Sequence, residues 1–186
     1  IQMESGRKFG LSSKSIMSNL QKLYEDGKIT YHRTDSVSLS QDCKNQIKSY
    51  ILNNYGEEYL KIKNFKNRTK NSQEAHEAIR PTNINLTQLE GAGIMQKIYR
   101  LIWLRTVASQ MSSCILNSSE IVIIISNRDE LFKAKTEKII FDGFRKIYES
   151  FKENNDDENK ITNLEGKVEK GEILTNERIE CNEKYK

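Results

Sequence analysis

The sequence has little cysteine, only one proline and no long apolar run. Without about eighteen consecutive apolar residues, no segment is expected to span a membrane. The first residues lack the charged-then-apolar pattern of a secretory signal. The three cysteines, Cys43, Cys114 and Cys181, are odd in number and far apart, with no CxxC spacing. They indicate reduced thiols in a cytoplasmic protein, and neither a zinc site nor a disulfide framework.

Charge is present in quantity but is unevenly spread. Residues 1–116 hold 17 Lys and Arg against 10 Asp and Glu, a balance of +7. Residues 117–186 hold 13 against 16, a balance of −3. The first part therefore has the balance of a module that faces a polyanion, although many lysine-rich surfaces bind nothing.

The first part is expected to be mainly helical. Residues 1–10 are polar, contain two glycines and are interpreted as an entry segment. Ser12 or Ser13 can cap a helix that ends at Gly27. A second helix is predicted to start at Ser40 and end before Gly56, and a third to span roughly Gly93 to Ser113. Their apolar stripes are formed by Ile16, Leu20, Leu23 and Tyr24, by Cys43, Ile47, Tyr50 and Ile51, and by Ile94, Ile98, Leu101, Ile102, Val107 and Met111.

Two basic or mixed stretches separate the second helix from the third. Residues 61–72 are basic and without periodicity, so they are expected to form a loop that is either a solvated linker or a strip that follows phosphates. Residues 72–81 (SQEAHEAIRP) favour a short helix that ends near Arg80, because proline follows. On that helix His76 and Arg80 would share a face. Tyr99 and Trp103 of the third helix are expected to fill the core or a contact between domains, and not to form a platform on which bases stack.

After residue 115 the sequence pattern changes from one typical of helices to one typical of strands. Residues 120–126 (EIVIIIS) are typical of a strand, and 131–135 and 138–141 are predicted to form two more with a polar turn between them. Residues 144–148 are expected to lead out of the sheet, and residues 166–179 to add a last strand or two. Residues 152–160 (KENNDDENK) are interpreted as a solvated loop and not as a metal cluster. The fold class predicted is α+β.

The chemistry is concentrated in Ile29–Ser36 (ITYHRTDS), directly after the first predicted helix. It combines a phenol, a guanidinium, a carboxylate and hydroxyls. A nucleophile that attacks phosphate needs such neighbours, namely a Tyr oxygen and an Arg to hold the phosphoryl oxygens. By itself, the pattern also fits an ordinary polar turn.

Two stretches together resemble one enzyme family. Residues 27–40 (GKITYHRTDSVSLS) look like the active-site signature of type IA DNA topoisomerases, and residues 73–82 (QEAHEAIRPT) resemble a second signature of that family. Further similarity runs through residues 23–25, 99–111 and 141–148. The AHEAIRP form is similar to the bacterial topoisomerase I branch, since the topoisomerase III branch typically has a second His in place of the Glu.

The resemblance implies roles for individual residues. Tyr31 would be the nucleophile that forms a 5′-phosphotyrosine, Arg33 would stabilise charge on the phosphoryl oxygens, and His76 would contact phosphate and help relay a proton. Residues implied at the DNA are Gln21, Glu25, Thr34, Asp35 and Arg80. His32 stands where this branch usually has Met, and we expect its side chain to point outward.

The same resemblance implies parts that are not recognisable here. In the family an acidic Mg²⁺-binding Toprim domain and a groove-completing domain precede this region. The chain is therefore expected to be a fragment, with a winged-helix-like tyrosine domain in residues 1–116 and part of a β-rich arch or hinge in residues 117–186. The whole enzyme would act on a single-stranded segment of negatively supercoiled DNA in the cytoplasm, with the nucleoid, and would need Mg²⁺ but no ATP.

A non-catalytic alternative stays open at this stage. A winged-helix DNA-binding module would explain the basic first part and its helices, but not the joint presence of Tyr31, Arg33 and the His76 signature. A scaffold domain would fit only the acidic second part.

Overall fold

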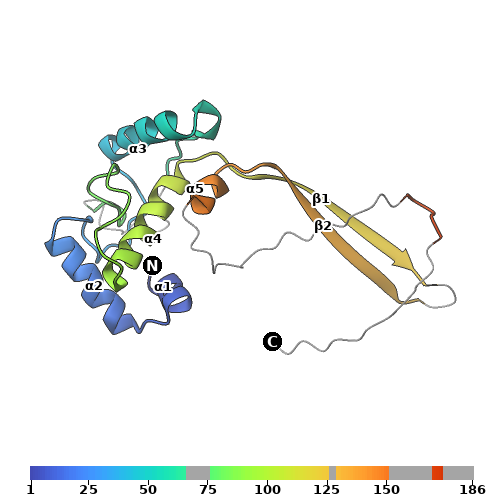
Figure 1. The fold of residues 1–186 in the computed structure, drawn as a ribbon, viewed down its shortest axis with the longest axis horizontal. Coiled ribbons are helices and arrows are strands. Elements are labelled where there is room, and N and C mark those ends of the chain that lie inside the picture. Colours follow the sequence, from blue (N-terminus) through green and yellow to red (C-terminus); the bar gives the residue numbers. More distant parts are fainter. Residues whose placement is uncertain (66–75, 126–128, 151–168, 174–186) are drawn as a thin grey trace. The chain divides into compact units, whose positions relative to one another are not determined.

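The computed structural model describes residues 1–65, 76–125, 129–150 and 169–173. Helices dominate the first part of the chain and a two-stranded sheet follows, which confirms the α+β class. The elements, labelled in Figure 1, are α1 (Gln2–Phe9), α2 (Ser13–Glu25), α3 (Gln41–Asn54), the 3₁₀ turn η1 (Glu57–Tyr59), α4 (Ile94–Ser109), β1 (Ile115–Ile124), β2 (Leu131–Phe141) and α5 (Arg145–Glu149).

Helices α2 and α3 begin and end much as their sequences predict. The side chain of Ser12 accepts a hydrogen bond from the Ser15 amide, and that of Ser40 does so from Cys43, so each caps its helix. After α2 the chain turns through Gly27, whose φ of 64° lies in the region that favours glycine. The predicted stripes of both helices are buried, apart from the half-buried Tyr50 and the exposed Tyr24.

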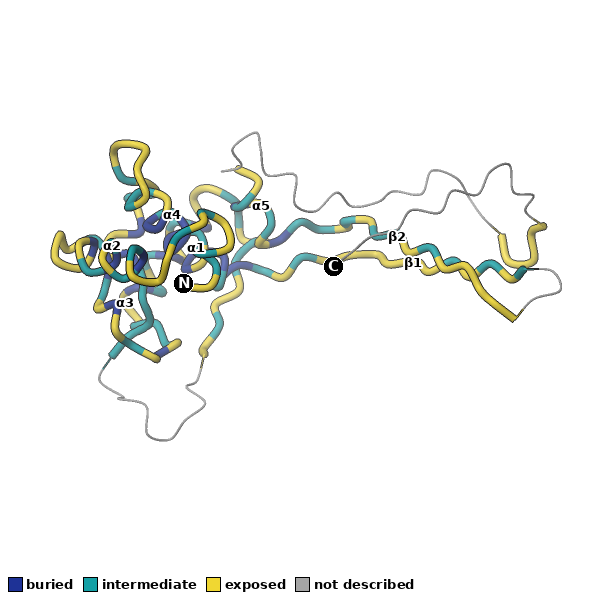
Figure 2. The backbone as a smooth tube through the Cα atoms, turned by 90° about the horizontal axis from the view of Figure 1, so that it is seen from below, coloured by how far each residue is buried: buried dark blue, intermediate teal, exposed yellow. Residues whose placement is uncertain are grey.

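Helix α4 supplies the centre of the core. Tyr99 and Trp103 are both fully buried, as expected for core residues. The Trp103 indole nitrogen donates to the Ile84 carbonyl at 2.8 Å, and the Tyr99 hydroxyl donates to the Leu86 carbonyl at 2.7 Å. Both large side chains therefore bury their polar atoms with partners. Figure 2 shows the buried residues gathered in this helical part.

The polar start of the chain is a helix, and not the predicted entry segment. Helix α1 ends at Gly10, which has a φ of 64° and donates its amide to the Gly6 carbonyl. A residue of another helix stabilises α1. Arg105 of α4 donates from Nε and Nη2 to one carboxylate oxygen of Glu4 in α1, at 2.9 and 2.6 Å. Such a tertiary ion pair cannot be read from local periodicity.

The helix predicted over residues 72–81 is not formed in residues 76–81, which are described. They run as extended chain and bends, and Pro81 forms an antiparallel bridge with Ile29. The Ala78 amide donates to the Ser38 carbonyl, so the backbone partners are tertiary and not helical. The idea that His76 and Arg80 share a helix face is therefore wrong. Residues 72–75 lie outside the described residues.

The strands are longer and fewer than the sequence predicts. Residues 131–141 form one continuous strand, β2, which pairs with β1 in a two-stranded sheet. The segment expected to lead out of the sheet is the short helix α5, whose Ile147 is fully buried in the helical core. Residues 169–173 contain no strand. The predicted loop at 152–160 and most of the expected last strands lie outside the described residues.

Contacts divide the described residues into two compact units. One contains residues 1–65, 76–117 and 139–150, and the other contains residues 118–125, 129–138 and 169–173. The expected boundary near residue 116 thus marks where the chain first leaves the helical unit, and residues 139–150 return to it. Within the described ranges, no helix is long and apolar enough to cross a membrane.

Candidate functional site

Backbone pairing brings the two signature stretches together. The Thr30 amide donates to the Arg80 carbonyl at 2.9 Å, and the Thr82 amide donates to the Lys28 carbonyl at 3.0 Å. The Thr30 hydroxyl donates to the Ala78 carbonyl at 2.8 Å and accepts from the Arg80 amide at 2.9 Å. Residues about fifty apart in sequence are therefore fixed side by side. Thr30 was not among the predicted site residues, although it lies inside the first signature.

Tyr31 follows this pairing and stands among aromatic rings. Its ring centroid lies 5.5 Å from that of His76, 5.5 Å from His32 and 5.3 Å from Tyr24. At 37% exposure, Tyr31 is accessible from solvent. The structure thus places the exposed Tyr31 beside two imidazoles. Sequence reasoning assigned Tyr24 to the apolar stripe of its helix and missed its contact with Tyr31.

His32 points inward, which corrects the prediction that it points outward. It is 4% exposed, and neither ring nitrogen has a hydrogen-bond partner. Burial lowers the pKa of His32, the positive charge of Arg33 lowers it further, and the negative charge of Glu25 opposes both. The imidazole is therefore held in its neutral form over more of the pH range than an exposed histidine.

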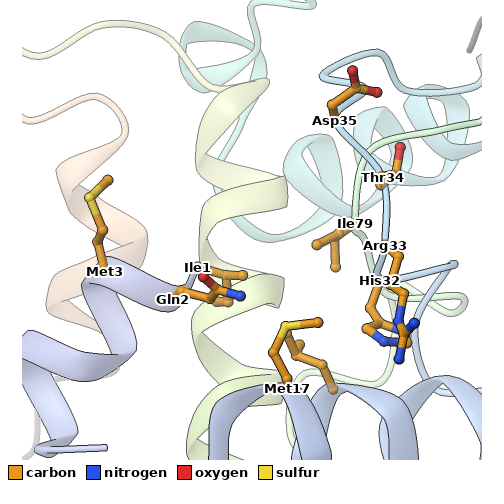
Figure 3. Close-up of a pocket in the computed structure, with 10 residues that line it drawn as sticks. Ile1, Gln2, Met3, Met17, His32, Arg33, Thr34, Asp35 and Ile79 are labelled. Atoms are coloured by element: carbon orange, nitrogen blue, oxygen red, sulfur yellow. The ribbon is translucent and has the colours of Figure 1, made fainter. Parts of the chain in front are cut away.

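Arg33, Thr34 and Asp35 line a cavity of about 510 Å³ beside the tyrosine. Figure 3 shows Arg33 next to His32 on one wall, with Met17 of α2 facing them. The Thr34 hydroxyl accepts a hydrogen bond from the Ser36 amide at 3.1 Å, which shapes the turn. The first signature therefore contributes both the phenol and one wall of a cavity.

Arg80 is engaged within the fold. Its Nε contacts Glu77 at 2.5 Å, its Nη1 donates to the Pro81 carbonyl at 3.0 Å, and its Nη2 reaches Ser40 at 3.5 Å. Burial by itself would raise the pKa of Glu77, but hydrogen bonds from Arg80 and Ser40 and the charge of Arg80 outweigh it and lower that pKa. Arg80 thus joins the second signature to the start of α3. A DNA contact by Arg80 stays a prediction.

Gln21 and Glu25 lie on the exposed side of α2. The Gln21 amide donates to the Glu25 carboxylate at 2.6 Å, so the two side chains form one polar pair. Glu25 is close enough to influence His32 electrostatically. This pair therefore borders the tyrosine cluster.

The described residues offer no donor set for a metal ion. They contain no group of three or more His, Cys, Asp or Glu side chains that could hold one. Cys43 is buried, and burial raises the pKa of its thiol. Among the residues that the structure describes, the side chains therefore do not fit a resident Mg²⁺ ion.

Comparisons with protein families and with curated proteins agree on one family. A sequence model of the DNA topoisomerase family matches residues 1–185. A prokaryotic-type DNA topoisomerase 1 of Acanthamoeba polyphaga mimivirus is 43% identical, over 100% of this chain and 23% of that protein. DNA topoisomerase 1 of Rickettsia bellii is 41% identical, over 87% of this chain and 22% of that protein. The chain therefore spans less than a quarter of the length of these curated relatives.

A solved structure shows the same similarity in three dimensions. Full-length topoisomerase I from Thermotoga maritima superposes with a TM-score of 0.67 and 34% sequence identity. The match covers 81% of this chain and 26% of that one. The structural comparison and the sequence comparisons therefore indicate the same family.

Proposed function

Because the chain belongs to the DNA topoisomerase family, we propose that it carries the nucleophile of an enzyme that relaxes negatively supercoiled DNA. The observation that supports this most is the meeting of the two signatures. Residues 28–30 pair with residues 80–82, and the ring centroids of Tyr31 and His76 lie 5.5 Å apart. The two residues are forty-five positions apart in the sequence. An ordinary polar turn would not require the two signature stretches to meet.

The proposed step is a transesterification in one DNA strand. The Tyr31 oxygen bonds to phosphorus, the bond from phosphorus to the 3′-oxygen breaks, and a 5′-phosphotyrosine and a 3′-hydroxyl result. The phenolic proton leaves toward His76, and the departing 3′-oxygen takes up a proton. Arg33 stabilises charge on the phosphoryl oxygens. The ester conserves the bond energy, so the reverse reaction reseals the strand without ATP.

The remaining parts of the proposal concern the whole polypeptide. A Toprim domain outside this chain supplies Mg²⁺, and the β-rich residues belong to a hinge that opens so that the other strand passes through the break. Gln21, Glu25, Thr34, Asp35 and Arg80 are proposed to face the single-stranded DNA. The enzyme works in the cytoplasm with the nucleoid, and the 186-residue chain alone does not relax DNA.

Replacing Tyr31 by Phe tests this proposal. In the full-length protein, Tyr31→Phe removes only the hydroxyl, so covalent adducts with a labelled single-stranded oligonucleotide should vanish while non-covalent binding remains. Adducts are measured by gel electrophoresis under denaturing conditions, and binding by fluorescence anisotropy.

Tyr24 provides a matched control, because its exposed phenol lies in the same cluster, 5.3 Å from Tyr31 between ring centroids. Tyr24→Phe should retain adducts. Adducts that persist in Tyr31→Phe would reject the assignment. Undiminished binding by a wild-type protein that never forms adducts would favour the non-catalytic DNA-binding module.

A further inference from the structure

The two strands join the helices through two short stretches of chain. Residues 112–117 include the start of β1, and residues 139–144 include the end of β2 and lead to α5. Both stretches belong to the same compact unit as the helices. These two stretches, called the strand junction below, therefore lie within the unit that holds Tyr31.

Backbone hydrogen bonds tie the strand junction to η1. The Ser112 amide donates to the Tyr59 carbonyl at 2.8 Å, and the Ser112 carbonyl accepts from the Phe144 amide at 2.8 Å. The Ser112 hydroxyl donates to the Glu58 carbonyl at 2.7 Å. Ser112 is therefore bonded both to η1 and to the chain that leaves β2.

Gly143 brings the two stretches of the junction into direct contact. Its φ of 51° lies in the region that favours glycine, and a Cβ at this position would lie 2.5 Å from the Ser113 carbonyl oxygen. Two backbones therefore touch where the chain enters and leaves the strand pair. Ile147, shortly after Gly143, is fully buried in the helical core and holds the end of this stretch.

Tyr59 adds a side-chain link to the same junction. Its hydroxyl donates to Asp142 Oδ1 at 2.8 Å, although the two residues are 83 positions apart in the sequence. This hydrogen bond, together with burial and the negative charge of Asp142, raises the pKa of Tyr59 to about 12. The phenol therefore keeps its proton near neutral pH and remains a donor.

A row of aromatic rings connects this link to the core. The centroid distances between successive rings are 5.0, 6.0, 6.4 and 5.3 Å in the order Phe141, Tyr59, Tyr55, Tyr50 and Trp103. The row begins at the last residue of β2 and ends at the fully buried Trp103 of α4. Because packed interiors have low compressibility and transmit strain, this row resists bending at the strand junction.

We propose that Tyr59 and Asp142 form a latch that keeps the strand junction rigid, so that movement of the strands also moves Tyr31 and the DNA end attached to it. The inference rests on the proposed function, in which the break opens so that the other strand can pass. A junction that bends would absorb the movement and leave the break closed. Tyr59 and Asp142 are therefore positioning residues for strand passage and not for cleavage.

Tyr59→Phe in the full-length protein separates the two steps, because it removes the hydroxyl and keeps the ring. Adduct yield on a labelled single-stranded oligonucleotide should equal that of wild type. Relaxation of supercoiled plasmid should slow roughly tenfold, the scale of one lost hydrogen bond to a charged group. Relaxation at the wild-type rate would overturn the proposal. A parallel loss of adducts and relaxation would also overturn it, since the bond would then serve the fold in general.

Asp142→Ala removes the same bond from the other side. It should slow relaxation as much as Tyr59→Phe does, and the double variant should be no slower than either single variant. The ion pair of Asp142 with Lys146, at 3.5 Å, is largely exposed and contributes little by comparison. Losses that multiply in the double variant would contradict a shared latch.

Tyr55→Phe is the matched control, because it removes a hydroxyl from the neighbouring ring, whose hydrogen bond is to Tyr50 within the helices. It should relax plasmid at the wild-type rate, and a tenfold loss would show that the effect is not specific to the latch. Hydrogen exchange of the full-length protein, followed by mass spectrometry, measures rigidity directly. The amides of Ser112 and Phe144 should exchange roughly tenfold faster in Tyr59→Phe and at the wild-type rate in Tyr55→Phe.

Unchanged exchange in Tyr59→Phe would show that the junction is rigid without the latch and would overturn the proposal. Failure of the proposed function itself is recognised separately, because wild type would then form no adduct on any single-stranded oligonucleotide.

Discussion

At the residue scale, His32 is the least expected feature of the site. A histidine with two unpartnered ring nitrogens is costly to bury, and here Arg33 adds a positive charge beside it. Glu25 is the opposing charge, and the other rings in contact are those of Tyr24 and Tyr31. The position therefore disfavours protonation and makes folding sensitive to pH.

Replacing His32 by Met should make the fold less sensitive to acid. The lowered pKa means that the folded chain holds this proton less tightly than the unfolded chain. Stability should therefore fall as the pH drops below about 6.5, the ordinary histidine value, and the penalty should be absent above it. His32→Met should remove this loss and add about 1–3 kcal/mol of stability by eliminating the unpartnered nitrogens. Urea unfolding between pH 5 and 8, followed by Trp103 fluorescence, measures both effects.

The second histidine serves as the control. His76 is half-buried and is not one of the buried groups that lack a hydrogen-bond partner. His76→Gln removes an imidazole from the same ring cluster but leaves His32 in place, so the loss of stability in acid that is assigned to His32 should remain. Identical pH dependence in wild type and His32→Met would show that His32 is not the group responsible.

At the element scale, the site depends on one short antiparallel pairing. Thr30→Val keeps the side-chain shape but removes the hydroxyl that links Ala78 and Arg80. We expect a loss of about 1–3 kcal/mol in unfolding free energy, because the Arg80 amide loses one partner. Adduct yield of the full-length protein should fall as well, since His76 is no longer fixed beside Tyr31.

Thr30→Ser separates the hydroxyl from the rest of the side chain. It restores both hydrogen bonds and should recover most of the stability and adduct yield. If Thr30→Val formed adducts at the wild-type level, the pairing would not be what positions the two signatures.

Local sequence predicted those elements whose partners are local. The Ser12 and Ser40 caps, the turn at Gly27 and the apolar stripes of α2 and α3 depend on residues a few positions apart. Residues 76–81 were misassigned because their backbone partners, at Lys28, Thr30 and Ser38, lie in a distant segment. Helix α1 was missed for the same reason, since its anchor is Arg105.

The sequence named candidate residues for the site, whose roles stay predictions, but it did not give their geometry. The resemblance named Tyr31, Arg33 and His76, and the structure brings the rings of Tyr31 and His76 together. It could not reveal that His32 is buried, because alternation along an extended segment does not say which neighbours will cover a side chain. The cavity was also invisible in the sequence, since its walls come from separate segments such as α2 and the residues around Ile79.

At the scale of the whole molecule, the chain supplies one half of the proposed chemistry. It matches less than a quarter of the length of its curated relatives, and its charge changes from +7 in residues 1–116 to −3 beyond them. The basic part contains the tyrosine cluster and its cavity. This distribution suits a nucleic-acid surface confined to the helical residues.

The proposed location of Mg²⁺, outside this chain, gives the last prediction. Chelation with EDTA should stop relaxation of supercoiled plasmid by the full-length protein, and added Mg²⁺ should restore it. The 186-residue chain should unfold at the same urea concentration with or without Mg²⁺. An ion at a hundred times its dissociation constant would stabilise the folded state by about 2.7 kcal/mol, which Trp103 fluorescence would detect. Such a shift would place a metal site within this chain, whereas relaxation that is unaffected by EDTA would remove Mg²⁺ from the mechanism.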